Sequence, residues 1–124
     1  MPYRNATCAR CIISTAGTDL PSSHARWDEV AQRIRDGAVA ILPVGTAAKQ
    51  HGFHLPLDTD RIQAEWLAAK MAEKIDALIW PTLAYGHYPA FVEYAGNSSL
   101  SDSTFETLVR EIAGQVLPAG GGAR

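Results

Sequence analysis

Two short apolar runs constrain the fold of this chain more than any other feature. Residues 38–42 read Ala-Val-Ala-Ile-Leu and residues 77–80 read Ala-Leu-Ile-Trp, and a proline follows each run directly. Continuous apolar runs of this length are typical of strands that are buried on both faces in a parallel sheet. The segment between the runs is long enough for the helical crossover that parallel neighbours require. The sequence therefore predicts an α/β fold.

Three helices are predicted around these strands. An amphipathic segment precedes the first run and stops at Gly37, and a second helix spans about residues 60–74, where Thr59 or Asp60 can cap it. Its broad apolar stripe consists of Ile62, Trp66, Leu67, Ala69, Met71 and Ile75. A third helix opens at residues 101–104 and carries apolar side chains on one face, namely Phe105, Leu108, Val109, Ile112 and Val116.

This alternation predicts a three-layer α/β/α sandwich with a mainly parallel sheet and right-handed crossovers. Two strands make a thin sheet, so the sandwich is expected to be incomplete in this chain. We expect residues 25–124 to form the N-terminal part of a larger domain. Residues 1–24, rich in small and polar residues, are expected to be an irregular N-terminal extension.

Composition excludes several classes of protein. The chain has 124 residues, a formal net charge of −2 and scattered basic residues, which argues against a nucleic-acid partner. No apolar run approaches the roughly 18 to 20 residues of a membrane span, so no membrane partner is expected. Cys8 and Cys11 lack the flanking strand and helix of a redox motif and the second ligand pair of a zinc knuckle. Without a disulfide framework, a cytoplasmic location is expected.

The segment after the first apolar run carries the ligand types of a metal site. Residues 51–60 contain His51, His54, Asp58 and Asp60. Imidazole nitrogens and carboxylate oxygens are the ligands that hard or borderline divalent cations prefer. The segment follows the carboxyl end of a predicted strand, which is where active sites lie in open α/β sheets. The sequence therefore predicts half of a metal site here.

The same segment resembles the creatininase, or creatinine amidohydrolase, family. The family signature is usually written Gly-Ser-x-Glu-Gln-His-Gly-Pro-His-Leu-Pro-Leu-x-Thr-Asp. This chain has Gly-Thr at residues 45–46, Gln-His-Gly-Phe-His-Leu-Pro-Leu at residues 50–57 and Thr-Asp at residues 59–60. The resemblance covers roughly residues 26–117 and continues through Tyr-Gly at residues 85–86, Tyr-Ala-Gly at residues 94–96 and Ser-Leu at residues 99–100.

The resemblance implies a binuclear metalloenzyme that uses zinc or manganese to hydrolyse a cyclic or linear amide with a metal-activated water. It places His51 on the family's imidazole ligand and Asp60 on the carboxylate that bridges the two metals. The family's other ligands and its substrate contacts follow an Asn-Gly-His-Gly-Gly-Asn segment, and this chain ends before it, so no catalytic residue is assigned. A small-molecule amide substrate and a homo-oligomer are expected by the same resemblance. The alternative is a truncated, catalytically silent paralogue that acts as a binding or subunit-interaction module.

One departure from the family pattern falls on a metal ligand. The signature's Glu ligand falls on Lys49, and a protonated amine has no lone pair for a cation. At close range its repulsion of a cation is worth on the order of 4 kcal/mol at an effective dielectric constant of 20. Three outcomes stay open: a single metal, a substitute ligand such as Gln50 or a residue absent here, or a Lys49 side chain that turns outward.

The remaining polar and aromatic candidates are assigned structural roles. His54 is expected to support the ligands or the loop, and Asp58 to be a solvated turn residue. His87 and Glu93 are expected to be ordinary loop residues, because the usual His of this family segment aligns with Phe91. Four aromatic residues are expected to cover a cleft or to pack between subunits, namely Tyr85, Tyr88, Phe91 and Tyr94.

Overall fold

The predicted order of helices and strands is confirmed in a computed structural model, which describes residues 24–116. The elements are α1 (Trp27–Arg35), β1 (Val39–Ile41), α2 (Thr59–Ala72), β2 (Ala77–Ile79), a short 3₁₀ helix η2 (Pro89–Phe91) and α3 (Asp102–Val116). Cys8 and Cys11 lie outside the described residues, as does the predicted extension apart from His24.

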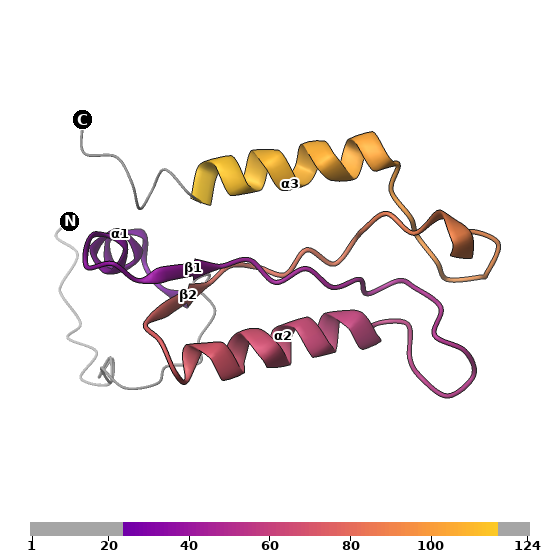
Figure 1. The fold of residues 1–124 in the computed structure, drawn as a ribbon, viewed down its shortest axis with the longest axis horizontal. Coiled ribbons are helices and arrows are strands. Elements are labelled where there is room, and N and C mark those ends of the chain that lie inside the picture. The colour runs from indigo at the N-terminus through magenta and orange to yellow at the C-terminus, as the bar shows by residue number, and fades with distance from the viewer. Residues whose placement is uncertain (1–23, 117–124) are drawn as a thin grey trace, which may run out of the picture.

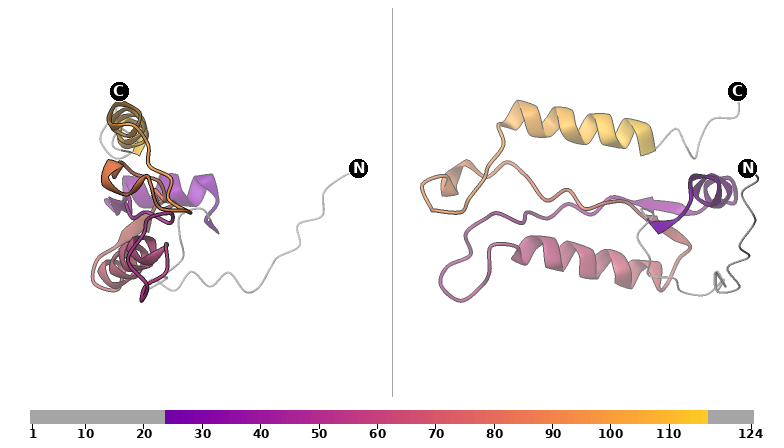
Figure 2. Two further views of the ribbon diagram at one scale, coloured as in Figure 1. Left: turned by 90° about the vertical axis from the view of Figure 1, so that its right-hand side faces the viewer. Right: turned by 180° about the vertical axis from the view of Figure 1, so that it is seen from behind.

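The strands form the middle layer of a three-layer arrangement. β1 and β2 pair in parallel, with Val39 opposite Ala77 and Ile41 opposite Ile79. In Figure 1, α2 lies below the strands and α3 lies above them, and the end-on view in Figure 2 keeps the two helices on opposite sides. The predicted α/β/α layering with a parallel sheet is therefore confirmed. No helix among residues 24–116 is long and apolar enough to cross a membrane.

Burial on both faces, predicted for both strands, is confirmed for β2 and wrong for β1. All three residues of β2 are buried, and Leu78 is only 1% exposed. In β1, Val39 is 49% exposed and only Ile41 is partly buried. The reason is the number of neighbours: β2 pairs with β1 and packs against α2, whereas β1 pairs only with β2 in the described part of the chain. An apolar run shows that a strand can be buried, but not whether its neighbours are present.

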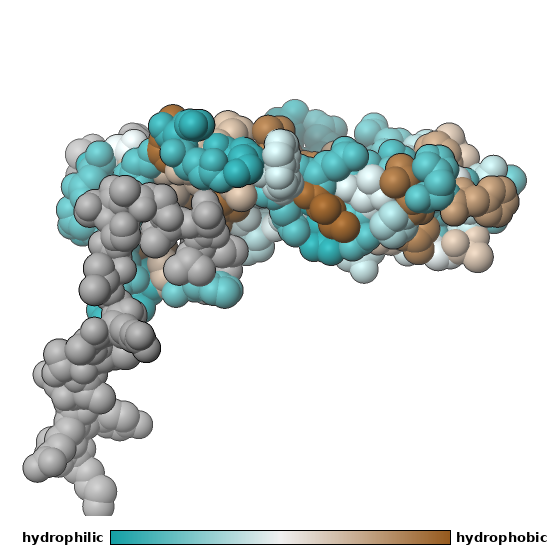
Figure 3. Space-filling view, turned by 90° about the horizontal axis from the view of Figure 1, so that it is seen from below, coloured by the Kyte–Doolittle hydropathy of each residue, from teal (hydrophilic) through white to brown (hydrophobic). Residues whose placement is uncertain are grey.

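The helix α2 contacts the strands through small residues, and its large apolar residues face outward. Ala68 is buried, whereas Trp66 is 63% exposed. The rest of the predicted stripe, apart from Ala69, is also exposed, namely Ile62, Leu67, Met71 and Ile75. Figure 3 views this underside of the molecule, where hydrophobic surface lies among hydrophilic side chains. The stripe predicted from periodicity therefore exists, but most of it is not part of the core.

The helix ends agree with the sequence in two cases and differ in one. Gly37 has a φ of 93° just after α1, the left-handed conformation that glycine allows at the end of a helix. Ser101 Oγ accepts a hydrogen bond of 3.3 Å from the Thr104 amide at the start of α3. Capping of α2 by Thr59 or Asp60 is wrong. Asp58 holds the N-cap position, and Thr59 Oγ1 instead donates to the Pro56 carbonyl at 2.7 Å.

Candidate metal centre

The candidate site lies just beyond the carboxyl ends of the two strands. Parallel pairing continues past them, because the amides of Gly45 and Ala47 donate to the carbonyls of Leu83 and Ala84 at 3.1 and 2.8 Å. The chain then loops out and returns to begin α2, where the Arg61 amide donates to the Thr46 carbonyl at 3.2 Å. The start of the loop and the first turn of α2 are thereby held side by side.

Gly45 makes this close approach possible. A Cβ atom at this position would overlap the backbone carbonyl of Asp60 and would come within 2.9 Å of Ala64 Cβ. Only a residue without a side chain allows the first turn of α2 to lie directly on the extended segment. The glycine that opens the family signature therefore sets the position of Asp60.

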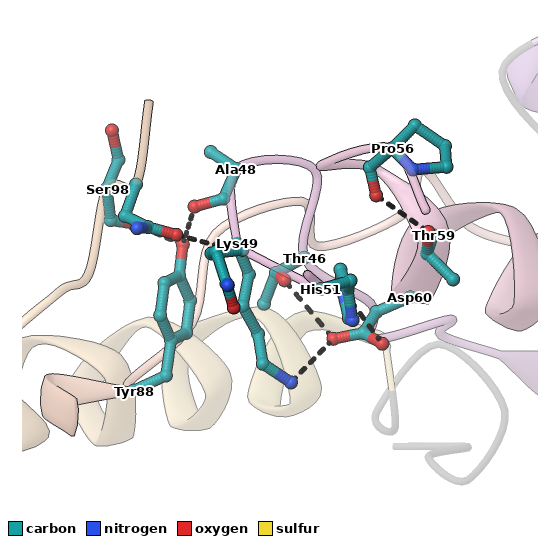
Figure 4. Close-up of polar contacts among 11 residues, drawn as sticks. Thr46, Ala48, Lys49, His51, Pro56, Thr59, Asp60, Tyr88 and Ser98 are labelled. Carbon is teal, nitrogen blue, oxygen red and sulfur yellow. Dashed lines mark hydrogen bonds and ion pairs between the residues drawn. The ribbon is translucent and has the colours of Figure 1, made fainter. Parts of the chain in front are cut away.

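The carboxylate of Asp60 is the centre of the polar cluster in Figure 4. Its Oδ2 accepts hydrogen bonds from Lys49 Nζ at 3.1 Å and from Thr46 Oγ1 at 3.4 Å. Its Oδ1 lies 3.5 Å from His51 Nε2. The two ligand candidates that the sequence singled out, His51 and Asp60, are thus brought together at one point.

His51 presents a buried nitrogen to this carboxylate, beyond hydrogen-bond geometry. The side chain is 14% exposed, and Nε2 is buried without a hydrogen-bond partner. A buried polar atom without a partner costs about 1 to 3 kcal/mol, so such an atom in a folded protein calls for a ligand that completes it. A divalent cation is one such ligand, because neutral imidazole offers a lone pair at this nitrogen.

The spacing of His51 and Asp60 fits one cation. Zinc lies about 2.0 to 2.1 Å from imidazole nitrogen and about 2.0 to 2.2 Å from carboxylate oxygen. These two bonds together exceed the 3.5 Å between His51 Nε2 and Asp60 Oδ1, so a single ion can contact both atoms. Within residues 24–116, however, no three His, Cys, Asp or Glu side chains gather into a possible metal site. Further ligands would have to come from elsewhere.

Lys49 points into the site. Its ammonium pairs with Asp60 Oδ2 and lies 5.7 Å from the centroid of the Phe91 ring. The outward-turned outcome that the sequence left open is therefore excluded. The backbone amide of Gln50 donates to Asn97 Oδ1 at 2.5 Å, and because this contact does not involve the side chain, Gln50 as a substitute ligand stays a prediction. Lys49 thus places a cationic side chain where the family signature has a glutamate ligand.

Tyr88 supports the loop from the neighbouring segment, a role that the sequence did not reveal. Its hydroxyl lies 2.8 Å from the Ala48 carbonyl and 2.5 Å from the Ser98 carbonyl, and its side chain is buried. Burial raises the pKa of the Tyr88 hydroxyl, and the hydrogen bond to Ser98 lowers it in part. The Ser98 amide also donates to the Ala48 carbonyl at 3.0 Å. No local pattern could have indicated these contacts, because Tyr88 and Ala48 lie far apart in the sequence.

The other sequence candidates lie outside the cluster. His54 is exposed, and Asp58 lies in a turn, as predicted, where its partly exposed carboxylate pairs with Arg61 at 2.7 Å. His87 Nδ1 lies 2.9 Å from the Leu100 carbonyl, and Glu93 is exposed. The four predicted aromatic residues do not form one cluster. Tyr88 is buried, Phe91 contacts Tyr94 at a centroid distance of 6.5 Å, and Tyr85 and Tyr94 are both more than half exposed.

Comparison with known proteins identifies the family. The family model described as "Creatininase: Creatinine amidohydrolase" matches residues 23–122, which is most of the chain. The chain belongs to the creatininase family. Among curated relatives, the creatinine amidohydrolase of Pseudomonas putida is 34% identical over 92 residues, which cover 69% of this chain and 35% of that protein. The mycofactocin precursor peptide peptidase of Mycolicibacterium smegmatis is 34% identical over 79 residues, which cover 59% of this chain and 32% of that protein.

Solved creatininase structures share the fold. A crystal structure of creatinine amidohydrolase (creatininase) superimposes with a TM-score of 0.75 at 28% identity and covers 86% of this chain and 42% of that one. The structure called "Creatininase Mn" gives a TM-score of 0.73 at 29% identity, over 79% of this chain and 40% of that one. A Glu-to-Gln mutant creatininase of the "Zn-Zn type" gives 0.73 at 28% identity, over 82% and 42%. The chain spans about a third of the length of the two curated relatives and about two fifths of the solved creatininase chains.

Proposed function

We propose that this chain supplies one part of a creatininase-type, metal-dependent amidohydrolase, with His51 and Asp60 as ligands of a divalent cation. The observation that carries the proposal is the buried His51 Nε2, which has no hydrogen-bond partner among the described residues and lies 3.5 Å from the Asp60 carboxylate. Two similar structures are named for manganese and for a zinc pair, which supports zinc or manganese as the cation. The substrate class that follows is a small molecule with a cyclic or linear amide bond, as in the creatinine amidohydrolase relative.

The chemistry of these residues is simple. His51 would bind the cation through a neutral nitrogen, and Asp60 would bind it through a negative oxygen that offsets part of its charge. Thr46 donates to the other carboxylate oxygen and so fixes the orientation of Asp60. When bound, the cation would supply Lewis acidity for hydrolysis of the amide. At least three protein ligands are usual in catalytic zinc sites, so this pair needs others.

Membership of the creatininase family supports three further proposals about the whole protein. Residues 25–124 would form the N-terminal part of a creatininase-like domain, the protein would assemble as a homo-oligomer, and it would act in the cytoplasm. The exposed apolar side chains of β1 and α2 support the expectation that further protein covers these surfaces.

The alternative is a catalytically silent module that binds another chain. The observation in its favour is that His51 and Asp60 lack a third His, Cys, Asp or Glu among the described residues. Hydrolysis of creatinine or of a related cyclic amide by the purified 124-residue chain would rule out this alternative.

Metal content tests the main proposal. The protein would be purified without chelators, and zinc and manganese would be measured by inductively coupled plasma mass spectrometry. We expect bound metal in the unaltered chain and loss of most of it in His51→Ala and in Asp60→Ala, because each substitution removes a ligand atom.

The matched control is His54→Ala, which removes an exposed imidazole from the same loop. It should bind metal as the unaltered chain does. An unaltered chain without metal, or equal losses in His51→Ala and His54→Ala, would contradict the assignment of these ligands.

A further inference from the structure

We propose that the Lys49 ammonium takes the place of one of the two cations, so that this site holds a single divalent ion on His51 and Asp60. The inference rests on the proposed metal-dependent function and departs from the two-metal centre that the family resemblance implies. The described residues supply two ligands toward one ion, His51 and Asp60, whereas at the second position a lysine stands where a ligand would be needed.

The first argument is that the Asp60 carboxylate is divided between two kinds of partner. Its Oδ2 is occupied by Lys49 Nζ at 3.1 Å and by Thr46 Oγ1 at 3.4 Å. Its Oδ1 lies 3.5 Å from His51 Nε2, a buried nitrogen that has no hydrogen-bond partner among the described residues. A carboxylate that bridges two metals through both of its oxygens offers one oxygen to each metal. Here one oxygen is open toward a ligand and the other already neutralises a fixed positive charge.

The second argument is that Lys49 is held in the site from several sides. Its side chain is 26% exposed, and its ammonium lies 3.1 Å from Asp60 Oδ2 and 5.7 Å from the centroid of the Phe91 ring. Its backbone amide donates to the Leu57 carbonyl at 3.2 Å. Carboxylates and aromatic faces both attract cations. The surroundings of the ammonium are therefore those of a resident cation, and a lysine that merely extends into solvent would lack them.

The third argument is the chemistry of the ammonium itself. A protonated lysine has three donors and no acceptor, so it cannot share a metal ion with Asp60. A second divalent ion at Oδ2 would have to displace Lys49 and would meet its positive charge at close range. One ammonium and one divalent ion also leave the site less positive than two divalent ions would.

Manganese binding to the full 124-residue chain tests the inference. Mn²⁺ would be titrated into the metal-free protein, with the number of ions counted by equilibrium dialysis. Electron paramagnetic resonance would separate isolated ions from an exchange-coupled pair that shares a carboxylate. We expect one ion per chain and only the uncoupled signal at every loading.

Two variants of Lys49 sharpen the test. Lys49→Glu restores a ligand at this position, and we expect it to bind two ions and to give the coupled signal. Lys49→Met removes the charge without adding a ligand, and we expect one ion bound about tenfold more tightly. Lys74→Glu, the same charge change at an exposed lysine after α2, is the matched control and should behave as the unaltered chain does. Circular dichroism would verify that each variant folds.

The possible failures are distinguishable. Two coupled ions in the unaltered chain would overturn the inference and leave the metal-dependent function standing. No bound ion in the unaltered chain would overturn both. A single ion in a folded Lys49→Glu variant would show that Lys49 does not exclude the second ion. If Lys49→Glu does not fold, unchanged affinity in Lys49→Met would overturn the inference instead.

Discussion

The two faces of α2 differ in how much of each is covered by the described residues. On the inner face, Gly45 lets the first turn lie directly on the extended segment, and Ala68 is buried against the strands. On the outer face, Trp66 and its apolar neighbours are exposed. The inner face shows that the geometry around Asp60 is fixed by contacts within this chain. The outer face is a surface that the described residues leave uncovered. The arrangement around Asp60 therefore forms although the large apolar side chains of α2 are exposed.

The largest expected effect comes from filling the inner contact. Gly45→Ala places a Cβ atom onto the Asp60 carbonyl, so α2 must move away from the strands. We expect the free energy of unfolding to fall by about 3 kcal/mol, at the upper end for overpacking, as measured by urea denaturation. The variant should also lose metal affinity, because Asp60 moves with the helix.

The matched control for that change is Gly114→Ala in α3. A Cβ there meets nothing within 4 Å, so alanine should stabilise the helix by about 0.5 to 1 kcal/mol. If both substitutions changed the free energy of unfolding equally, the close approach of α2 to Gly45 would not be the reason that position 45 requires glycine.

A smaller effect is expected where Tyr88 supports the loop. Tyr88→Phe removes the hydroxyl whose single proton is shared between the Ala48 and Ser98 carbonyls, and we expect the free energy of unfolding to fall by about 1 to 2 kcal/mol in urea denaturation. Tyr94→Phe, at an exposed tyrosine, should change stability by less than about 0.5 kcal/mol.

The same tyrosine predicts a dependence on pH. Burial raises the pKa of Tyr88, so the folded protein keeps the proton when the unfolded chain has released it. Its contribution is therefore constant below the ordinary tyrosine pKa of about 10, and stability falls as pH rises above that value. Tyr88→Phe should flatten this fall in the unfolding free energy. If the unfolding free energy fell equally with rising pH in both proteins, the fall would be due to groups other than Tyr88.

The smallest effect on folding is expected on the outer face of α2. Trp66→Lys replaces an exposed aromatic side chain, so the free energy of unfolding of the isolated chain should change by less than about 0.5 kcal/mol. If this face is an interface between copies, sedimentation velocity should show weaker self-association in the variant. A large loss of stability in the monomer would mean that the outer face belongs to the core after all.

The sequence predicted the elements better than their surroundings. The apolar runs located both strands, and the His-rich signature located His51 and Asp60, because these features are local. The exposure of Val39 was not predictable, since burial depends on neighbours that a run of apolar residues does not specify. The direction of Lys49 and its place beside Phe91 were left open for a similar reason, as they depend on contacts between distant segments.

The contacts between residues 48–50 and residues 88–98 have a consequence for motion. The Ala48 carbonyl, the Gln50 amide and the Tyr88 hydroxyl all take part in bonds that join the two segments. Neither segment can leave its position without breaking bonds to the other, so the two should open and close as one cooperative unit. The rate at which an ion reaches His51 would then depend on that joint opening. A substitution in either segment would alter this rate.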